Sequence, residues 1–269
     1  MNFKSTLAKG ILLFVILVSS CKKEEHLNDQ SIHLAGKLKE EYVQYNGNIK
    51  FLYFYDQDKT LLKQEQWAEG ILLAANEYRY LDGKLYFRTY STYAGPNAPL
   101  RVFSVSKYTY TGELLTRVVE NVLERHGLES DIVTSLYYDD EGSLTFARRW
   151  QLTAEGYPLM THNFFKTDAA GNILTIKEVN VTNGVTAKPN IYSMKYDDKH
   201  NPRYRLVDPL EFSHYFSPNN VIGLNEKTPA TEHDVHFLYQ YNIQQMPLSL
   251  QVDDVVESDF RDVAKWIYY

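Results

Sequence analysis

Aromatic and aliphatic residues recur in short runs that alternate with polar residues, and turns of Asp, Asn or Gly separate the runs. In residues 85–90, Leu85 and Phe87 point to one side of a strand while Tyr86 and Arg88 point to the other. No long segment carries apolar residues at the i, i+3, i+4 and i+7 spacing of a helix. The pattern therefore predicts an all-β protein.

One unit returns along the chain: an aromatic run leads into a turn, and Leu or Ile opens the next run. Five copies start at Tyr53, Tyr78, Tyr108, Tyr137 and Phe164, in steps of 25 to 30 residues. Weaker copies follow at 196–201 and 239–248. A period of this length indicates a repeated supersecondary unit.

Each unit has the signature of a β-hairpin. Asp82-Gly83 lies between two aromatic runs, and a type I′ turn needs positive φ at both central residues. Gly112, Gly142 and Gly171 occupy the equivalent position, where glycine adopts a left-handed conformation at least cost. The copies at 56–60 and 197–201 lack this glycine.

Hairpins stacked edge to edge form an antiparallel meander. We expect residues 31–269 to build one long twisted sheet, which either stays extended or curls into an open barrel or sandwich. Leu34, Leu38 and Tyr42 are spaced by four, as in a helix, but an Asn-Gly turn at 46–47 favours a strand there. The period lapses over 208–234, which predicts an irregular insertion.

The N-terminus has the parts of an export signal. Lys4 and Lys9 precede an apolar run at 11–18, and small serines at 19 and 20 precede Cys21. An eight-residue run is too short to span a bilayer, which takes about 20 apolar residues. Cys21 is the only cysteine, so it cannot form a disulfide within the chain.

Residues 18–21 resemble the lipobox of bacterial lipoproteins. This resemblance implies cleavage of residues 1–20 and lipid attachment at Cys21, with residues 21–30 as a flexible tether. Two or more acyl chains anchor a protein stably to a membrane. The charged run at 22–25 resembles the surface-export signal of Bacteroidota lipoproteins, which implies the outer membrane, facing the cell exterior.

The 28 Lys and Arg and 34 Asp and Glu give a net charge of −6, and loss of Lys4 and Lys9 takes the mature chain to −8. This acidic balance, without a basic cluster, argues against nucleic acid as a partner. The 22 Tyr and 13 Phe suit strands, because an aromatic ring packs on the pleated surface while a tyrosine hydroxyl still reaches water.

The tyrosine–aspartate turns resemble the YD (RHS-like) repeats of bacterial surface proteins. Together with the lipobox, the chain resembles Bacteroidota outer-membrane lipoproteins of unknown function that are built from such repeats. The resemblance covers nearly all of 21–269 and brings no catalytic residue and no cofactor.

The residues themselves offer three candidates for chemistry. His233 and His236 are of metal-ligand type, but they lie in a predicted strand, where a spacing of three places them on opposite faces. Acidic pairs at 139–140, 197–198 and 253–254 are explained by Asp residues that cap their own turns, at least in the first two cases. We therefore predict no metal site and no catalytic residue.

The aromatic residues have two possible roles. They either pack the sheet or stack on sugar rings or a protein partner, and they include Trp67, Trp150, Trp266 and the tyrosine rows. Three functions remain open. We favour a non-enzymatic envelope lipoprotein that displays a β-repeat surface for binding or scaffolding. The alternatives are an accessory glycan-binding protein of an outer-membrane uptake system and a hydrolase with a site in the 208–234 insertion.

Overall fold

The computed structural model describes residues 37–44, 48–93, 95, 99–123, 129–152, 158–206, 211–254 and 261–269. The strands are β1 (Leu38–Gln44), β2 (Asn48–Tyr55), β3 (Leu61–Ala68), β4 (Ile71–Leu81), β5 (Lys84–Thr92), β6 (Arg101–Thr111), β7 (Leu114–Leu123), β8 (Glu129–Tyr138), β9 (Leu144–Leu152), β10 (Pro158–Thr167), β11 (Ile173–Thr182), β12 (Val185–Thr186), β13 (Asn190–His200), β14 (Asn219–Lys227), β15 (Glu232–Tyr241), β16 (Pro247–Asp254) and β17 (Arg261–Tyr268). A four-residue helix, α2 (Phe212–Tyr215), lies between β13 and β14.

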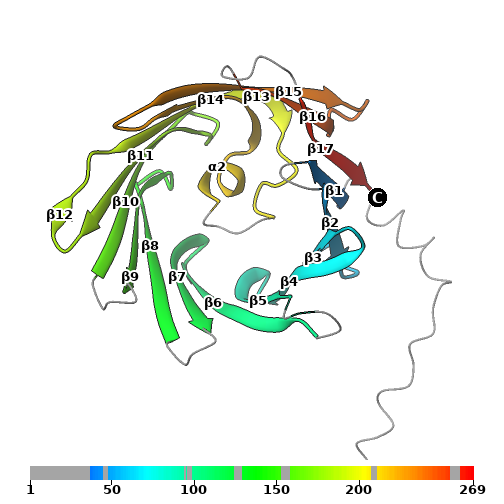
Figure 1. Cartoon of the computed structure of the whole chain (residues 1–269), viewed down its shortest axis with the longest axis horizontal. Coiled ribbons are helices and arrows are strands. Elements are labelled where there is room, and N and C mark those ends of the chain that lie inside the picture. The colour runs from blue at the N-terminus through cyan, green and yellow to red at the C-terminus, as the bar shows by residue number, and fades with distance from the viewer. Residues whose placement is uncertain are drawn as a thin grey trace, which may run out of the picture.

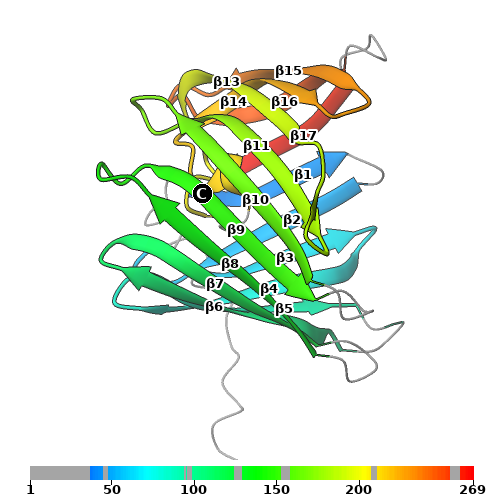
Figure 2. The ribbon, with the colours of Figure 1, turned by 90° about the vertical axis from the view of Figure 1, so that its left-hand side faces the viewer.

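The strands form a closed barrel (Figures 1 and 2). Each strand pairs antiparallel with the next, and β1 closes the sheet by pairing with β17 through Glu41↔Trp266 and Val43↔Ala264. Because β11 also pairs directly with β13, sixteen strands form the wall and β12 is a short addition. The predicted meander is confirmed, and the sheet closes completely instead of remaining open.

The predicted repeats are hairpins of this barrel. The five strong copies are β2–β3, β4–β5, β6–β7, β8–β9 and β10–β11, and the weaker copies lie in β13–β14 and β15–β16. Since antiparallel neighbours connect at alternate ends, all seven repeat turns lie at one end of the barrel. We call it the repeat end.

Positive φ angles occur in these turns where the sequence predicts them. Asp82 and Gly83 have φ of 50° and 75°, and Gly112, Gly142 and Gly171 are also positive. In the turns of the copies at 56–60 and 239–248, which have no glycine, Lys59 and Gln245 take the left-handed conformation, with φ of 64° and 61°.

Aspartate or asparagine stabilises the longer repeat turns. The Asp139 carboxylate accepts hydrogen bonds from the backbone N–H groups of Glu141 and Ser143, at 3.1 and 2.8 Å. Three further turns use the same pattern, with N–H donors two and four residues later, at Asp56, Asp168 and Asn242. The predicted capping by Asp is therefore confirmed in the repeat turns.

A tyrosine at the end of a repeat strand joins neighbouring hairpins. The hydroxyl of Tyr138 donates to the carbonyl of Leu115, 23 residues earlier, at 2.7 Å. Tyr196 donates to Ile173 O, also 23 residues earlier, and Tyr268 donates to Pro247 O, 21 residues earlier. Phenylalanine could fill the same space, but it could not make this bond, so the repeat has a reason to carry tyrosine.

Residues of a strand alternate between the lumen and the outside except at bulges: beside the bulge in β5, Leu85 packs in the core with buried Arg88, so the expected pairing of Leu85 with Phe87 on one face is wrong. In β6, Ser106 and Tyr108 are buried, whereas Lys107 and Thr109 are exposed. The buried apolar side chains form two clusters inside the barrel, one centred on β6–β14 and the other on β1–β4 with β15–β17.

Two predictions about the chain course can be compared with the barrel. Residues 38–44 form a strand, as expected, and residues 34–36 lie outside the described part. Within the span 208–234 that was expected to be irregular, 219–227 form β14 and 232–241 form β15, whereas the described residues 201–206 and 211–218 form no strand. The span 208–234 contains prolines and an asparagine pair, which are typical of irregular structure. Asn219 and Asn220 nevertheless begin strand β14.

Candidate functional site

Residues 201–206 and 211–218 lie in the lumen, and the second stretch contains α2, which Figure 1 shows inside the ring of strands. We call these described residues the plug. Sixteen-stranded barrels are too wide to be filled by their wall side chains alone. The plug fills part of this space: Phe212 and Phe216 pack against the first apolar cluster, and Leu206 packs against the second.

A buried ion pair holds the plug to the opposite wall. The guanidinium of Arg203 lies 2.8 Å from the carboxylate of Glu41 in β1, and Glu41 is 1% exposed. Tyr53 donates its hydroxyl to the same carboxylate at 2.7 Å. Burial opposes the charged form of Arg203, but Glu41, Tyr53 and Glu211 together outweigh it, so the pKa of Arg203 lies above its ordinary value.

The two ends of the plug are tied to each other and to the wall. The Asn201 side chain donates to the carbonyls of His214 and Ser217, both at 2.9 Å. The Ser217 hydroxyl accepts the backbone N–H of Ile173 at 3.0 Å and lies 3.0 Å from the Tyr196 hydroxyl. The plug is thus fixed by side-chain bonds in place of sheet pairing.

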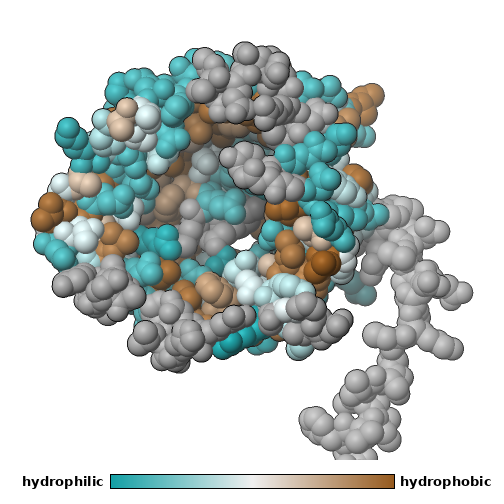
Figure 3. Space-filling view, viewed as in Figure 1, coloured by the Kyte–Doolittle hydropathy of each residue, from teal (hydrophilic) through white to brown (hydrophobic). Residues whose placement is uncertain are grey.

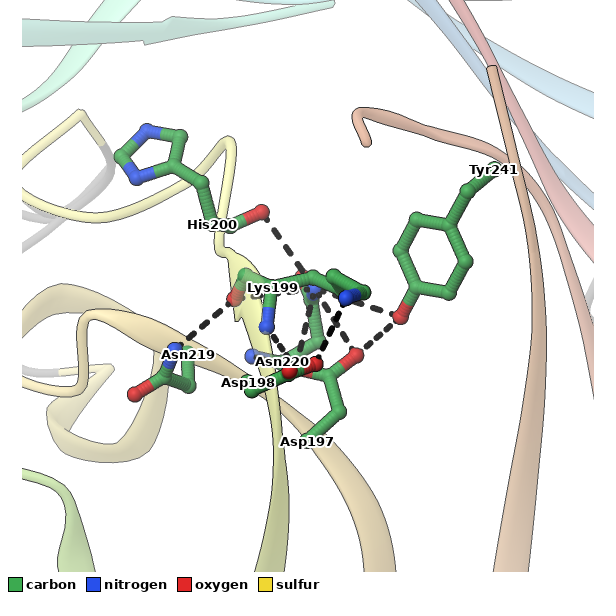
Figure 4. Close-up of polar contacts among 7 residues, drawn as sticks. All are labelled: Asp197, Asp198, Lys199, His200, Asn219, Asn220 and Tyr241. Carbon is green, nitrogen blue, oxygen red and sulfur yellow. Dashed lines mark hydrogen bonds and ion pairs between the residues drawn. The ribbon is translucent and has the colours of Figure 1, made fainter. Parts of the chain in front are cut away.

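A polar cluster marks the place where the plug leaves β13 and returns into β14 (Figure 4). Asp197 accepts hydrogen bonds from the Tyr241 hydroxyl and from the backbone and side chain of Asn220. Asn219 donates to the carbonyl of Lys199 at 3.0 Å. Burial and the bond to Asp197 raise the pKa of Tyr241, so this hydroxyl remains a donor.

At the repeat end, three tyrosines of the wall lie near Tyr215 of α2. Tyr80, Tyr110 and Tyr138 line a cavity of about 350 Å³ together with Tyr215. Burial, and next the proximity of Tyr215, raise the pKa of each of the three wall tyrosines.

Beyond the plug lies a larger cavity of about 460 Å³, with a wall that is polar on one side. Arg149, Asn163 and Glu178 project from β9, β10 and β11, and α2 faces them. Arg149 is exposed, so this cavity reaches solvent. Figure 3 shows a hollow at the centre of the barrel end.

A smaller cavity of about 260 Å³ continues along the other side of α2. It shares Met194, His214 and Leu224 with the larger one, and its remaining wall is mainly apolar and aromatic, with Tyr239 and Trp266. Burial, and next the charge of Arg203, lower the pKa of His214 to about 4, so its imidazole is neutral at pH 7. The two cavities form the candidate site.

The predicted chemical residues lie apart from one another. His233 and His236 are exposed on β15, which confirms the predicted strand. Asp253 lies in β16 opposite His236. Within the described residues, no three His, Cys, Asp or Glu side chains lie close enough to hold a metal ion.

The three tryptophans differ in environment. Trp67 donates to Glu65 at 3.0 Å on β3, and Trp150 is partly buried on β9. Trp266 is buried in the lumen, where it stacks on Tyr239. Cys21 and the tether at 21–30 lie outside the described residues.

Sequence reasoning missed the residues that hold the plug. Glu41 and Arg203 are 162 positions apart and belong to no motif, so no local signal connects them. The tyrosine hydrogen bonds between hairpins do leave a signal in the sequence. Leu115 and Tyr138 have the same spacing as Ile173 and Tyr196.

The comparisons with known proteins give the fold. A porin-like protein from Bacteroides vulgatus superposes on this chain with a TM-score of 0.60 and 10% sequence identity. The match covers 87% of this chain and 98% of the Bacteroides chain. A porin-like protein from Bacteroides uniformis has a TM-score of 0.53 and 11% identity over the same shares. No family model and no curated protein sequence matches the chain. In the described part, no helix has the length and hydropathy needed to cross a bilayer.

Proposed function

We propose that this chain is a non-enzymatic envelope lipoprotein, anchored through lipid on Cys21, whose barrel stands in water and binds a small ligand in its lumen. The lipobox-like residues 18–21 support the anchor, and the two luminal cavities support the binding role. The barrel takes the place of the flat repeat surface expected from the sequence, with the lumen as the binding face.

The distribution of charge on the barrel wall carries this proposal. Lys107, Arg148, Lys177 and Lys195 are exposed near the middles of β6, β9, β11 and β13. A barrel that spans a membrane presents an apolar band at these positions, and a Lys or Arg at the bilayer midplane costs about 2–4 kcal/mol. Several such residues would oppose insertion strongly.

The side chains in the lumen differ in character from the charged side chains on the outer wall. Tyr53, Tyr108, Val118 and Ile173 are at most 2% exposed inside the barrel. An interior that holds two apolar clusters, together with a mixed, charged exterior, is the arrangement of a barrel surrounded by water. The "porin-like" description belongs to the two Bacteroides proteins, and a membrane-spanning pore is the competing hypothesis for this chain.

The outer wall also supports a second candidate, a glycan-binding accessory protein. Tyr137, Phe146 and Phe164 form a continuous row across β8, β9 and β10, with ring centroids 5.4 and 5.0 Å apart. Tyr137 and Phe164 are 44% and 46% exposed. A Phe164→Ala variant should lose binding to an immobilised polysaccharide if this row holds sugar rings, whereas a luminal-binding protein should not respond.

The direct test exchanges the anchor for an ordinary cleavage site. Ser19→Ala with Cys21→Ala in the full-length gene removes the lipid but retains export. The barrel should then appear in the soluble periplasmic fraction and remain monodisperse without detergent. A barrel that stays in the membrane fraction and needs detergent would contradict the proposal.

A further inference from the structure

The smaller luminal cavity has two buried hydrogen-bond donors that find no acceptor in the part of the chain that the structure describes. Trp266 is 7% exposed, and its indole N–H finds no acceptor among the described residues. Nε of Arg203 likewise lacks one, although Nη2 of the same guanidinium donates to Glu41. Both residues line the cavity. Buried polar groups in proteins are nearly always paired, so such a pair of donors calls for an acceptor oxygen supplied from outside the chain.

The rest of the wall determines the other properties of such a molecule. Val221, Leu224, Phe237 and Leu250 give an apolar surface, which disfavours a strongly hydrated ligand. Trp266 and Tyr239 stack with centroids 5.9 Å apart and an interplanar angle of 20°, so they form an aromatic patch of two nearly parallel rings. This patch suits a flat ring more than a branched chain.

The charges around the cavity decide against an anion. Arg203 is the cation, and it already faces two carboxylates, Glu41 at 2.8 Å and Glu211 at 3.8 Å. His214, on the boundary with the larger cavity, carries no charge at pH 7. No positive charge is therefore left to balance an anionic ligand.

The volume of the smaller cavity and its connection to the larger one are compatible with a two-ring molecule. A dry cavity of about 150 Å³ can hold benzene, and this one measures about 260 Å³. The larger cavity shares Met194, Ser213 and Leu224 with it and reaches solvent at Arg149, so a ligand can pass along α2.

We propose that the smaller luminal cavity binds a neutral, flat, apolar ring molecule that carries one hydrogen-bond-accepting oxygen, with Trp266 as its principal donor. This proposal rests on the proposed function only in using the lumen as the binding site, since it does not depend on where the barrel stands relative to the membrane.

Three naphthalene probes of matched size separate the features of the proposed ligand. They are 2-acetylnaphthalene, with a neutral carbonyl, 2-ethylnaphthalene, without oxygen, and 2-naphthoate, with an anionic carboxylate. Binding is measured by equilibrium dialysis against the mature lipidated protein in phosphatidylcholine vesicles, with empty vesicles subtracted. The ketone should bind about tenfold more tightly than either of the others, the size expected for one additional buried hydrogen bond.

Three variants test whether Trp266 and this cavity cause the preference for the ketone. Trp266→Phe keeps the aromatic wall but removes the donor, so the ketone should fall to the affinity of the hydrocarbon. Trp150→Phe, on the outer face of β9, should leave all three affinities unchanged. Leu224→Trp fills the cavity from the opposite wall and should abolish ketone binding, which keeps the test valid if Trp266→Phe does not fold.

Several results would overturn the inference. Naphthoate binding as tightly as the ketone would show that the site selects an anion. No saturable binding of the ketone, or an unchanged preference in Trp266→Phe, would show that water alone satisfies the indole. If the ketone binds but the barrel without its anchor stays in the membrane fraction, the proposed location is wrong and the luminal binding site is still supported.

Discussion

Replacing Arg203 by methionine should destabilise the protein strongly, because Glu41 would be left buried without its cation. The methionine side chain is of comparable length and still fills part of the space between the plug and β1. Removing one partner of a buried pair typically costs about 3–5 kcal/mol. Glu41 is 1% exposed and keeps only the Tyr53 hydroxyl as a partner, so the loss should reach this range.

The assay is calorimetric unfolding of the mature protein at pH 7, where one kcal/mol corresponds to about 2–4 °C for a chain of roughly this size. The expected decrease in Tm for Arg203→Met is therefore about 6–20 °C. Adding Glu41→Gln should recover most of it, since a neutral amide can still accept the Tyr53 hydroxyl and needs no counter-charge.

A second ion pair of the same length serves as the control. Lys227 and Glu232 also lie 2.8 Å apart, but both side chains are more than half exposed. Lys227→Met should therefore leave the Tm close to that of the wild type, since exposed pairs contribute little. If both methionine variants melt like the wild type, the buried pair does not hold the plug and the reasoning fails.

Three further predictions concern turns, protonation and the tyrosine bonds. Gly83→Val should cost about 1–3 kcal/mol in thermal melts through backbone strain alone, because no atom lies within 4 Å of an added Cβ, whereas Lys59→Gly should stabilise its left-handed turn. The pKa of His214 is about 4 in the folded protein and about 6.5 in the unfolded chain. Its contribution to folding stability is therefore complete above pH 6.5 and is lost as pH falls toward 4. A His214→Gln variant should lose less stability across that pH range than the wild type in denaturant titrations. Tyr138→Phe should lower stability by about 1 kcal/mol, while Tyr137→Phe at the exposed neighbour should not.

Local features of the fold followed from the sequence. Period-two alternation and turns such as Asp82-Gly83 depend on neighbouring residues, so the strands, the hairpins and their order could be predicted. Closure could not, because the pairing of Glu41 with Trp266 joins the two ends of the chain and the alternation of each strand would be the same in an extended sheet.

The candidate site depended on contacts of the same long range. The plug has no period, and its position inside the barrel is set by Arg203 and Asn201, which bind partners in other elements. The sequence predicts that Trp266 either packs the sheet or stacks on a partner. The closed barrel shows that it packs in the lumen, where it lines the smaller cavity.

The central claim is that the outer wall of the barrel faces water, and thiol labelling in isolated outer membranes tests it most directly. Cys21 is the only native cysteine, so the unmutated chain provides the background for Lys107→Cys and Lys177→Cys. Val118→Cys, which is 2% exposed at the native valine, is the protected control. A water-soluble maleimide should label both outer cysteines in membranes at rates within about twofold of those in detergent, in keeping with the cost of a charged side chain in lipid. Outer cysteines that react only after detergent is added would place the wall in lipid and contradict the account.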